Sequence, residues 1–122
     1  MDLKVGMYVR FKDKRGIEYI RKITSVNNTY PDKLYAGIYI DKNANNSNGV
    51  SLKNIIKTSF NIIDLIQKKD YANGLPVTKI SEDIETGEKY LNLYGCISEW
   101  GEEDIINVVT KEEFDTRRYY VR

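Results

Sequence analysis

The chain has 122 residues, a formal net charge of +1, no histidine and a single cysteine. This length predicts one compact domain or two very small ones. Catalytic sites of the Ser-His-Asp or Cys-His kind need an imidazole, and one cysteine supplies neither a structural zinc site nor an intrachain disulfide. We therefore expect a protein that is not an enzyme and that uses no metal and no cofactor.

The composition predicts a mainly β fold. There are 15 Ile, 8 Val and 10 Tyr against 3 Ala and 7 Leu. β-branched and aromatic side chains suit a pleated sheet, whereas Ala and Leu favour helices. We expect a β-rich α+β protein with two small SH3-like or bent antiparallel sheets and one or two short helices.

The first half alternates strands and turns. Apolar and basic residues alternate in Tyr8–Lys12, which places Arg10 and Lys12 on one face. The polar segment Asp13–Gly16 predicts a hairpin turn. The further strands predicted here are Ile17–Val26, Leu34–Ile40 and Val50–Lys57, with an Asn-rich loop at Lys42–Gly49.

The second half begins near Ser59 with a connector at Phe60–Ile66, which has room for one helical turn. Asn73-Gly74 is a strong hairpin signal, and Thr110 with Glu113 forms a capping box that opens a short helix. The strands predicted in this half are Pro76–Ile80, Lys89–Ile97, Ile105–Val109 and Arg117–Val121.

The two halves resemble each other. Leu3–Val9 matches Ile66–Ala72, and Ile55–Thr58 matches Val108–Lys111 at a different offset. The match favours a duplicated β unit over one continuous sheet. We divide the chain into a basic half, residues 1–59, and an acidic half, residues 60–122, which we expect to form one compact unit together.

Charge divides the same halves. Residues 1–59 carry 11 basic and 5 acidic side chains, and residues 60–122 carry 8 basic and 13 acidic ones. This asymmetry favours head-to-tail packing of the halves, within one chain or between subunits, or a basic partner-binding face on the first half.

The strongest candidate binding site combines aromatic, amide and arginine side chains. Alternation places Tyr90, Asn92 and Tyr94 on one face of a strand, where they would contact a base with Trp100 nearby. Arginine side chains hold phosphate in a bidentate manner. The predicted ligand-binding residues are Tyr90, Asn92, Tyr94, Trp100, Arg117, Arg118 and Tyr119. A tyrosine-rich subunit interface explains the same residues equally well.

Two charged segments are further candidates. Cations interleaved with aromatic side chains suit nucleic acid, although lysines also protect an edge strand from aggregation. The alternative nucleic-acid-binding residues are Arg10, Lys12, Lys14, Arg15 and Arg21. In the acidic loop, Glu102 and Asp104 are the candidates for a metal-dependent hydrolase, but the spacing matches no calcium loop and solvated carboxylates are the simpler interpretation.

No segment predicts a membrane or secretion function. The charged N-terminal Met1–Lys4 lacks the apolar stretch of a signal peptide, and the longest apolar runs are too short to span a bilayer. We expect no membrane partner.

Three segments carry a resemblance to a group of known proteins. Asn61–Ile66, Asp70–Gly74 and Val108–Phe114 resemble short accessory proteins of phages and prophages of low-GC Gram-positive bacteria, Clostridia among them. The resemblance implies the bacterial host cytoplasm as location and an anti-defence role through stoichiometric binding.

From the residues and this resemblance together we expect a non-enzymatic protein that sequesters a host nucleotide immune signal of the cyclic ADP-ribose type. The expected assembly is a homodimer or higher homo-oligomer. The alternative is an anti-CRISPR-type inhibitor that binds nucleic acid or a host defence protein through its basic N-terminal hairpin.

Overall fold

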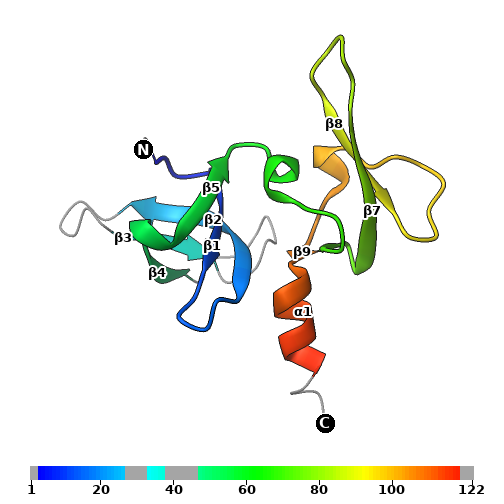
Figure 1. Ribbon diagram of the computed structural model, residues 1–122. Helices are drawn as coiled ribbons and strands as arrows, with labels where there is room; N and C mark the ends of the chain where they lie inside the picture. Colours follow the sequence, from blue (N-terminus) through cyan, green and yellow to red (C-terminus); the bar gives the residue numbers. More distant parts are fainter. Residues whose placement is uncertain (1–2, 27–32, 38–46, 119–122) are drawn as a thin grey trace.

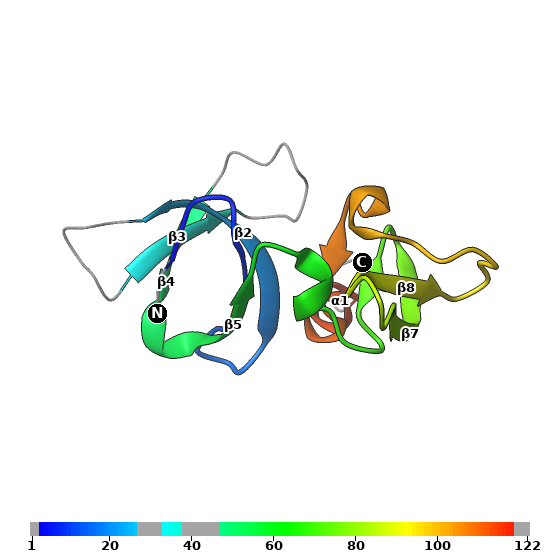
Figure 2. The same cartoon turned by 90° about the horizontal axis from the view of Figure 1, so that it is seen from above.

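Two antiparallel sheets and one short helix make up the described part of the chain, which confirms the predicted β-rich α+β class. The structure, a computed structural model, describes residues 3–26, 33–37 and 47–118. The first sheet has the strand order β4-β3-β2-β1-β5, and the second has the order β8-β7-β6-β9. The two sheets lie side by side, joined by a single-turn connector (Figures 1 and 2).

The first sheet is a meander whose last strand returns to the free side of the first strand. Its strands are β1 (Tyr8–Lys12), β2 (Glu18–Val26), β3 (Lys33–Gly37), β4 (Ser47–Ser51) and β5 (Ile55–Ser59). A 3-10 turn, η1 (Leu52–Asn54), precedes β5. The connector contains a second 3-10 turn, η2 (Ile62–Leu65), as predicted for Phe60–Ile66.

The second sheet repeats this arrangement with four strands instead of five. Its elements are β6 (Tyr71–Ala72), β7 (Leu75–Glu82), β8 (Lys89–Leu93), the 3-10 turn η3 (Glu102–Asp104) and β9 (Val108–Val109), followed by helix α1 (Lys111–Arg118). As in the first sheet, the first strand lies between the second and the last strand. Neither sheet closes into a barrel within the described residues, so the β-barrel that the SH3-like alternative implied is wrong.

The turns that lead into the two sheets have the same pattern of backbone hydrogen bonds. In each copy one backbone N–H closes the turn, and two more join the turn to the second strand of the sheet. These bonds are Met7 N to Lys4 O (3.2 Å), Gly6 N to Ile23 O (3.0 Å) and Ile23 N to Met7 O (2.7 Å) in the first copy, and Asp70 N to Gln67 O (3.1 Å), Lys69 N to Val77 O (3.0 Å) and Val77 N to Asp70 O (2.7 Å) in the second. The matched bonds support the predicted duplication, with Tyr8 equivalent to Tyr71.

The predicted alignment of the closing segments is wrong. Val9 pairs with Thr58, and Ala72, the equivalent of Val9, pairs with Val108. Thr58 therefore corresponds to Val108, whereas the sequence match had set it against Lys111. Loops of different length between the strands explain why no single offset aligns both ends of the repeat.

Several predicted strand boundaries are corrected. The strand expected at Val50–Lys57 is divided between β4 and β5 by η1, and β4 already begins inside the expected Asn-rich loop. The strand expected at Lys89–Ile97 ends at Leu93, because Gly95 turns the chain at a φ of 80°. In the strand expected at Ile105–Val109, only the last two residues pair.

A strand was expected at Arg117–Val121, but the first two residues of that segment are helical. Helix α1 includes Arg117 and Arg118, and residues 119–121 lie outside the described part. Thr110 caps the helix, since its hydroxyl accepts the backbone N–H of Glu113 (3.1 Å). The ring of Phe114 stacks on Tyr71 at a centroid distance of 3.9 Å, and this tertiary contact supports a helix too short to be stable alone.

The larger of two hydrophobic clusters contains residues from both halves. Tyr8 and Ile20 of the first sheet pack there with Ile63, Leu91 and other buried side chains of the second half. Because neighbouring strand residues face opposite sides, Val9 points the other way, into a smaller cluster with Ile23 and Val50. Side chains on one face of β1 thus pack in the first sheet's own core. Side chains on the other face pack where the two halves meet, which we call the joint.

Candidate functional site

The aromatic residues predicted to bind a base lie on β8 and the loop that follows it. Leu91 and Leu93 are buried, so the predicted alternation on this strand is confirmed. Tyr90 and Asn92 are half-buried on the other face, whereas Tyr94 is 69% exposed. Trp100 pairs with Leu91 through two backbone hydrogen bonds of 2.8 Å and packs against the larger hydrophobic cluster.

Tyr90 faces an acidic neighbourhood. Its hydroxyl donates a hydrogen bond to the Glu88 carboxylate (2.5 Å), which raises the pKa of Tyr90 to about 12. A small hollow of about 200 Å³ adjoins it and is lined by Asn61, Glu88, Lys89, Tyr90, Gly101, Glu102 and Glu103. Three carboxylates at this hollow repel phosphate, so Tyr90 is poorly placed for an anionic nucleotide.

The predicted arginines lie away from these aromatic residues. Arg117 and Arg118 belong to the last turn of α1, at the opposite end of the second half from β8 (Figure 1). Tyr119 lies outside the described residues. The structure therefore does not bring the aromatic set and the arginine pair together into one site.

Arg10, predicted as part of a nucleic-acid-binding hairpin, is instead buried between the two halves. Its side chain is only 2% exposed, and its Nη1 donates to the Asp70 carboxylate (2.7 Å) and to the Leu65 carbonyl (3.0 Å). Its Nε donates to the Glu18 carboxylate (2.5 Å). Burial alone would lower the pKa of Arg10, but the hydrogen bonds to Asp70 and Glu18 outweigh it and raise that pKa.

Arg21 is also buried at the joint. Its guanidinium forms a bidentate pair with Glu113 of α1, with two N–O distances of 3.0 Å. Nearby, the Thr110 hydroxyl donates to the Glu18 carbonyl (2.5 Å). The charge asymmetry of the sequence thus matches packing within one chain, where arginines of the basic half meet carboxylates of the acidic half.

The remaining residues of the predicted basic set are exposed. Lys12, Lys14 and Arg15 lie on β1 or on the turn after it, and Arg15 is paired with Asp13 at 3.0 Å. With Arg10 and Arg21 buried, the five predicted cations do not form one open face. This arrangement weakens the nucleic-acid alternative.

The carboxylates of the acidic loop bond to the loop's own backbone or line the small hollow. In η3, Asp104 accepts the backbone N–H of Gly101 (3.0 Å), and Glu102 lines the small acidic hollow. Within the described residues, no group of three or more acidic or thiol side chains is arranged to hold a metal ion. In that same part of the chain, no helix is long and apolar enough to cross a membrane.

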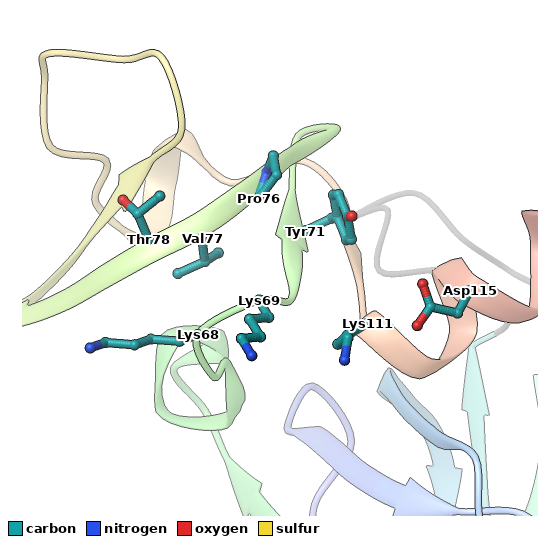
Figure 3. A pocket seen from close by; sticks show the side chains of 8 residues that line it. All are labelled: Lys68, Lys69, Tyr71, Pro76, Val77, Thr78, Lys111 and Asp115. Atoms are coloured by element: carbon teal, nitrogen blue, oxygen red, sulfur yellow. The ribbon is translucent and has the colours of Figure 1, made fainter.

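A larger pocket, which was not predicted from the sequence, lies between the second sheet and α1. Its volume is about 480 Å³, and Figure 3 shows its lining: Lys68, Lys69, Tyr71, Pro76, Val77, Thr78, Lys111 and Asp115. Val77, Pro76 and the Tyr71 ring supply an apolar surface. Three lysines and one aspartate surround it, so the pocket is positively charged and suits an anion.

The lysine ammonium groups are free to bind a ligand. Lys68, Lys69 and Lys111 are exposed, and none of them has an ion pair with another described residue. In Figure 3 the side chains of Lys69 and Lys111 point in the same direction, and Lys68 points away from them. Lys69 and Lys111 therefore present their ammonium groups on the same side of the pocket (Figure 3), with Asp115 also in the lining.

The buried Asp70 holds the lysine-bearing segments together. One carboxylate oxygen accepts the backbone N–H of Gln67 (2.8 Å), and the other accepts the backbone N–H of Lys111 (3.1 Å). The first bond orders the turn that carries Lys68 and Lys69. Because Arg10 compensates the charge of Asp70, the joint between the halves also positions the pocket.

A second carboxylate, Asp64, links η2 to β8. It accepts hydrogen bonds from Lys89 Nζ and the Ser59 hydroxyl, both at 2.5 Å. Burial would raise the pKa of Asp64, but these two bonds outweigh it and hold the pKa below its usual value of 3.8. The folded state therefore favours the ionised form.

This shift predicts a loss of stability in acid. The contribution of Asp64 is complete above about pH 4 and disappears as the pH falls through the lowered pKa of the folded state. In urea titrations at pH 7 and pH 3, Asp64→Asn should reduce the difference in unfolding free energy between the two pH values, by less than about 1 kcal/mol for a partly exposed pair. An unchanged difference would show that Asp64 is not stabilised by Lys89.

Comparisons with known proteins add no assignment. No protein-family model matches the chain, and neither a curated protein nor a solved structure matches it at a significant level.

Proposed function

We propose that this protein is a non-enzymatic binding protein that sequesters a small nucleotide-like anion in the pocket between the second sheet and α1. The observation that supports the proposal is the juxtaposition of three lysines without ion pairs to described residues and an apolar surface that includes Tyr71. Ammonium groups bind phosphate oxygens, and an aromatic face binds a planar base.

The position of Lys111 adds to this support. Lys111 is the first residue of α1, where the helix dipole disfavours a positive charge. Its side chain lines the pocket and pairs with no described carboxylate. A ligand phosphate in the pocket would bring a negative charge to this ammonium group.

The proposed nucleotide site lies in a different part of the second half from the binding residues predicted by the sequence. Cyclic ADP-ribose-type signals are members of the ligand class, since they combine phosphates with a purine. Their identity as the ligand, the phage source and the homo-oligomer stay predictions.

Isothermal titration calorimetry tests the proposal. The ligands are inorganic phosphate, adenosine, AMP, ADP-ribose, cyclic ADP-ribose isomers and cyclic dinucleotides. We expect the phosphorylated purines to bind more tightly than adenosine or phosphate alone. Lys111→Ala should weaken their binding about 10-fold or more, as expected for the loss of a hydrogen bond between charged groups.

Lys79→Ala is the matched control. Lys79 is an exposed lysine of β7 that does not line the pocket, so its removal changes the net charge equally. Its affinity for AMP should stay close to that of the wild type. No binding across the panel, or equal weakening by both substitutions, would contradict the proposal.

A further inference from the structure

Lys69 has an unusual backbone conformation. Within the described residues, only Lys69 (φ 79°) and Asn73 (φ 51°) have positive φ values without being glycine. Asn73 lies in the Asn-Gly hairpin turn, where this conformation is common. A lysine in the left-handed region is disfavoured because its Cβ crowds the following carbonyl group.

The first copy of the repeat shows what the fold itself requires at this position. Gly6 is the equivalent of Lys69; it has a φ of 95°, and its backbone N–H donates to Ile23 just as that of Lys69 donates to Val77. A Cβ built on Gly6 would meet nothing within 4 Å. Space alone therefore admits a side chain at this position, but the positive φ favours glycine in both copies of the repeat.

The side chain of Lys69 contributes little to the fold. It is exposed, and it forms no ion pair or side-chain hydrogen bond with another described residue. Its ammonium group instead lies at the rim of the pocket, directed to the same side as that of Lys111 (Figure 3). Strained backbone that folding does not require is typical of functional sites.

We infer that Lys69 is the residue that gives the second copy of the repeat its anion specificity, and that a ligand phosphate lies between Lys69 and Lys111. The inference rests on the proposed function and deepens it, because it distinguishes these two lysines from Lys68. The first copy has glycine at the equivalent position, so it lacks this cation.

The test is Lys69→Gly, which should separate stability from binding. Removing the strain should raise the melting temperature by about 3 °C, even though an ammonium group is lost. Calorimetry with AMP and with inorganic phosphate should show at least about a 10-fold weaker affinity than in the wild type.

Two variants serve as controls. Lys68→Gly removes the same charge and introduces the same residue where the backbone has no positive φ. It should lower the melting temperature and weaken AMP binding less than Lys69→Gly does. The reverse substitution Gly6→Lys should lower the melting temperature, because it introduces the strain into the first copy.

The outcomes separate the two proposals. If the wild type binds none of the anions, the proposed function and this inference are both overturned. If the wild type binds AMP and Lys69→Gly binds it equally well, only the role of Lys69 is overturned. A lower melting temperature for Lys69→Gly would also overturn it, since the backbone would then not be strained.

Discussion

Replacing Arg10 with alanine is expected to destabilise the protein by about 3–5 kcal/mol, because it leaves the buried Asp70 carboxylate without its compensating charge. The Leu65 carbonyl and Glu18 would lose their partners as well. For a domain of this size, such a change is a large part of the whole free energy of unfolding. The loss should also disturb the pocket, since Asp70 holds the backbone of Gln67 and Lys111.

Urea denaturation followed by tryptophan fluorescence measures this effect. Trp100 is the only tryptophan, and it packs against the cluster shared by the halves, so its emission reports unfolding. Arg15→Ala is the control, because Arg15 forms an ion pair at the surface with a side chain that is 58% exposed. Its cost should stay below about 1 kcal/mol. Similar small costs for both variants would contradict the buried network.

A double-mutant cycle isolates the central pair. Arg10→Met and Asp70→Asn each remove one partner, and their combination removes the buried charges together. The double variant should be less destabilised than the sum of the two single variants. Additive effects would show that Arg10 and Asp70 act independently.

The fold class was predictable because its signals are local. Alternating apolar and polar residues identified β1, and the Asn73-Gly74 pair identified the hairpin between β6 and β7. The extent of α1 was not predictable from Arg117 and Arg118 themselves. That helix depends on the stacking of Phe114 on Tyr71, a contact between segments distant in sequence.

The buried arginines show why the basic hairpin was misinterpreted. Alternation correctly placed Arg10 on the opposite face from Val9, but it does not say whether that face meets solvent or the other half of the chain. The opposite charges of the two halves were the available signal. They indicated complementary packing, and the structure shows Arg10 and Arg21 at that joint.

The lysine pocket was missed because its parts come together only through tertiary bonds. Lys69 and Lys111 are distant in sequence, and Asp70 joins their segments through backbone hydrogen bonds. The repeat contained one usable clue. Aligning Leu3–Val9 with Ile66–Ala72 sets Lys69 against Gly6, and a lysine at a position that suits glycine marks a residue that the fold does not explain.

The two halves should unfold as one unit. Ile20 lies on the first sheet, is fully buried and packs in the cluster that the second half dominates, whereas Ile23 packs in the first sheet's own cluster. Ile20→Ala and Ile23→Ala should each cost about 2–5 kcal/mol through lost burial and the cavity that is left. Cooperative unfolding means that both variants lower the midpoint of one common transition.

Ile23→Ala is the more demanding of the two tests, because its cavity lies in the first half and the fluorescent probe lies in the second. If the halves are coupled through Arg10, Arg21 and Ile20, the Trp100 signal must shift to lower urea along with the circular dichroism of the whole chain. If the Trp100 midpoint stays where it is in the wild type, the second half is stable without the first. The pocket in the second half would then not depend on the charge pair between the halves.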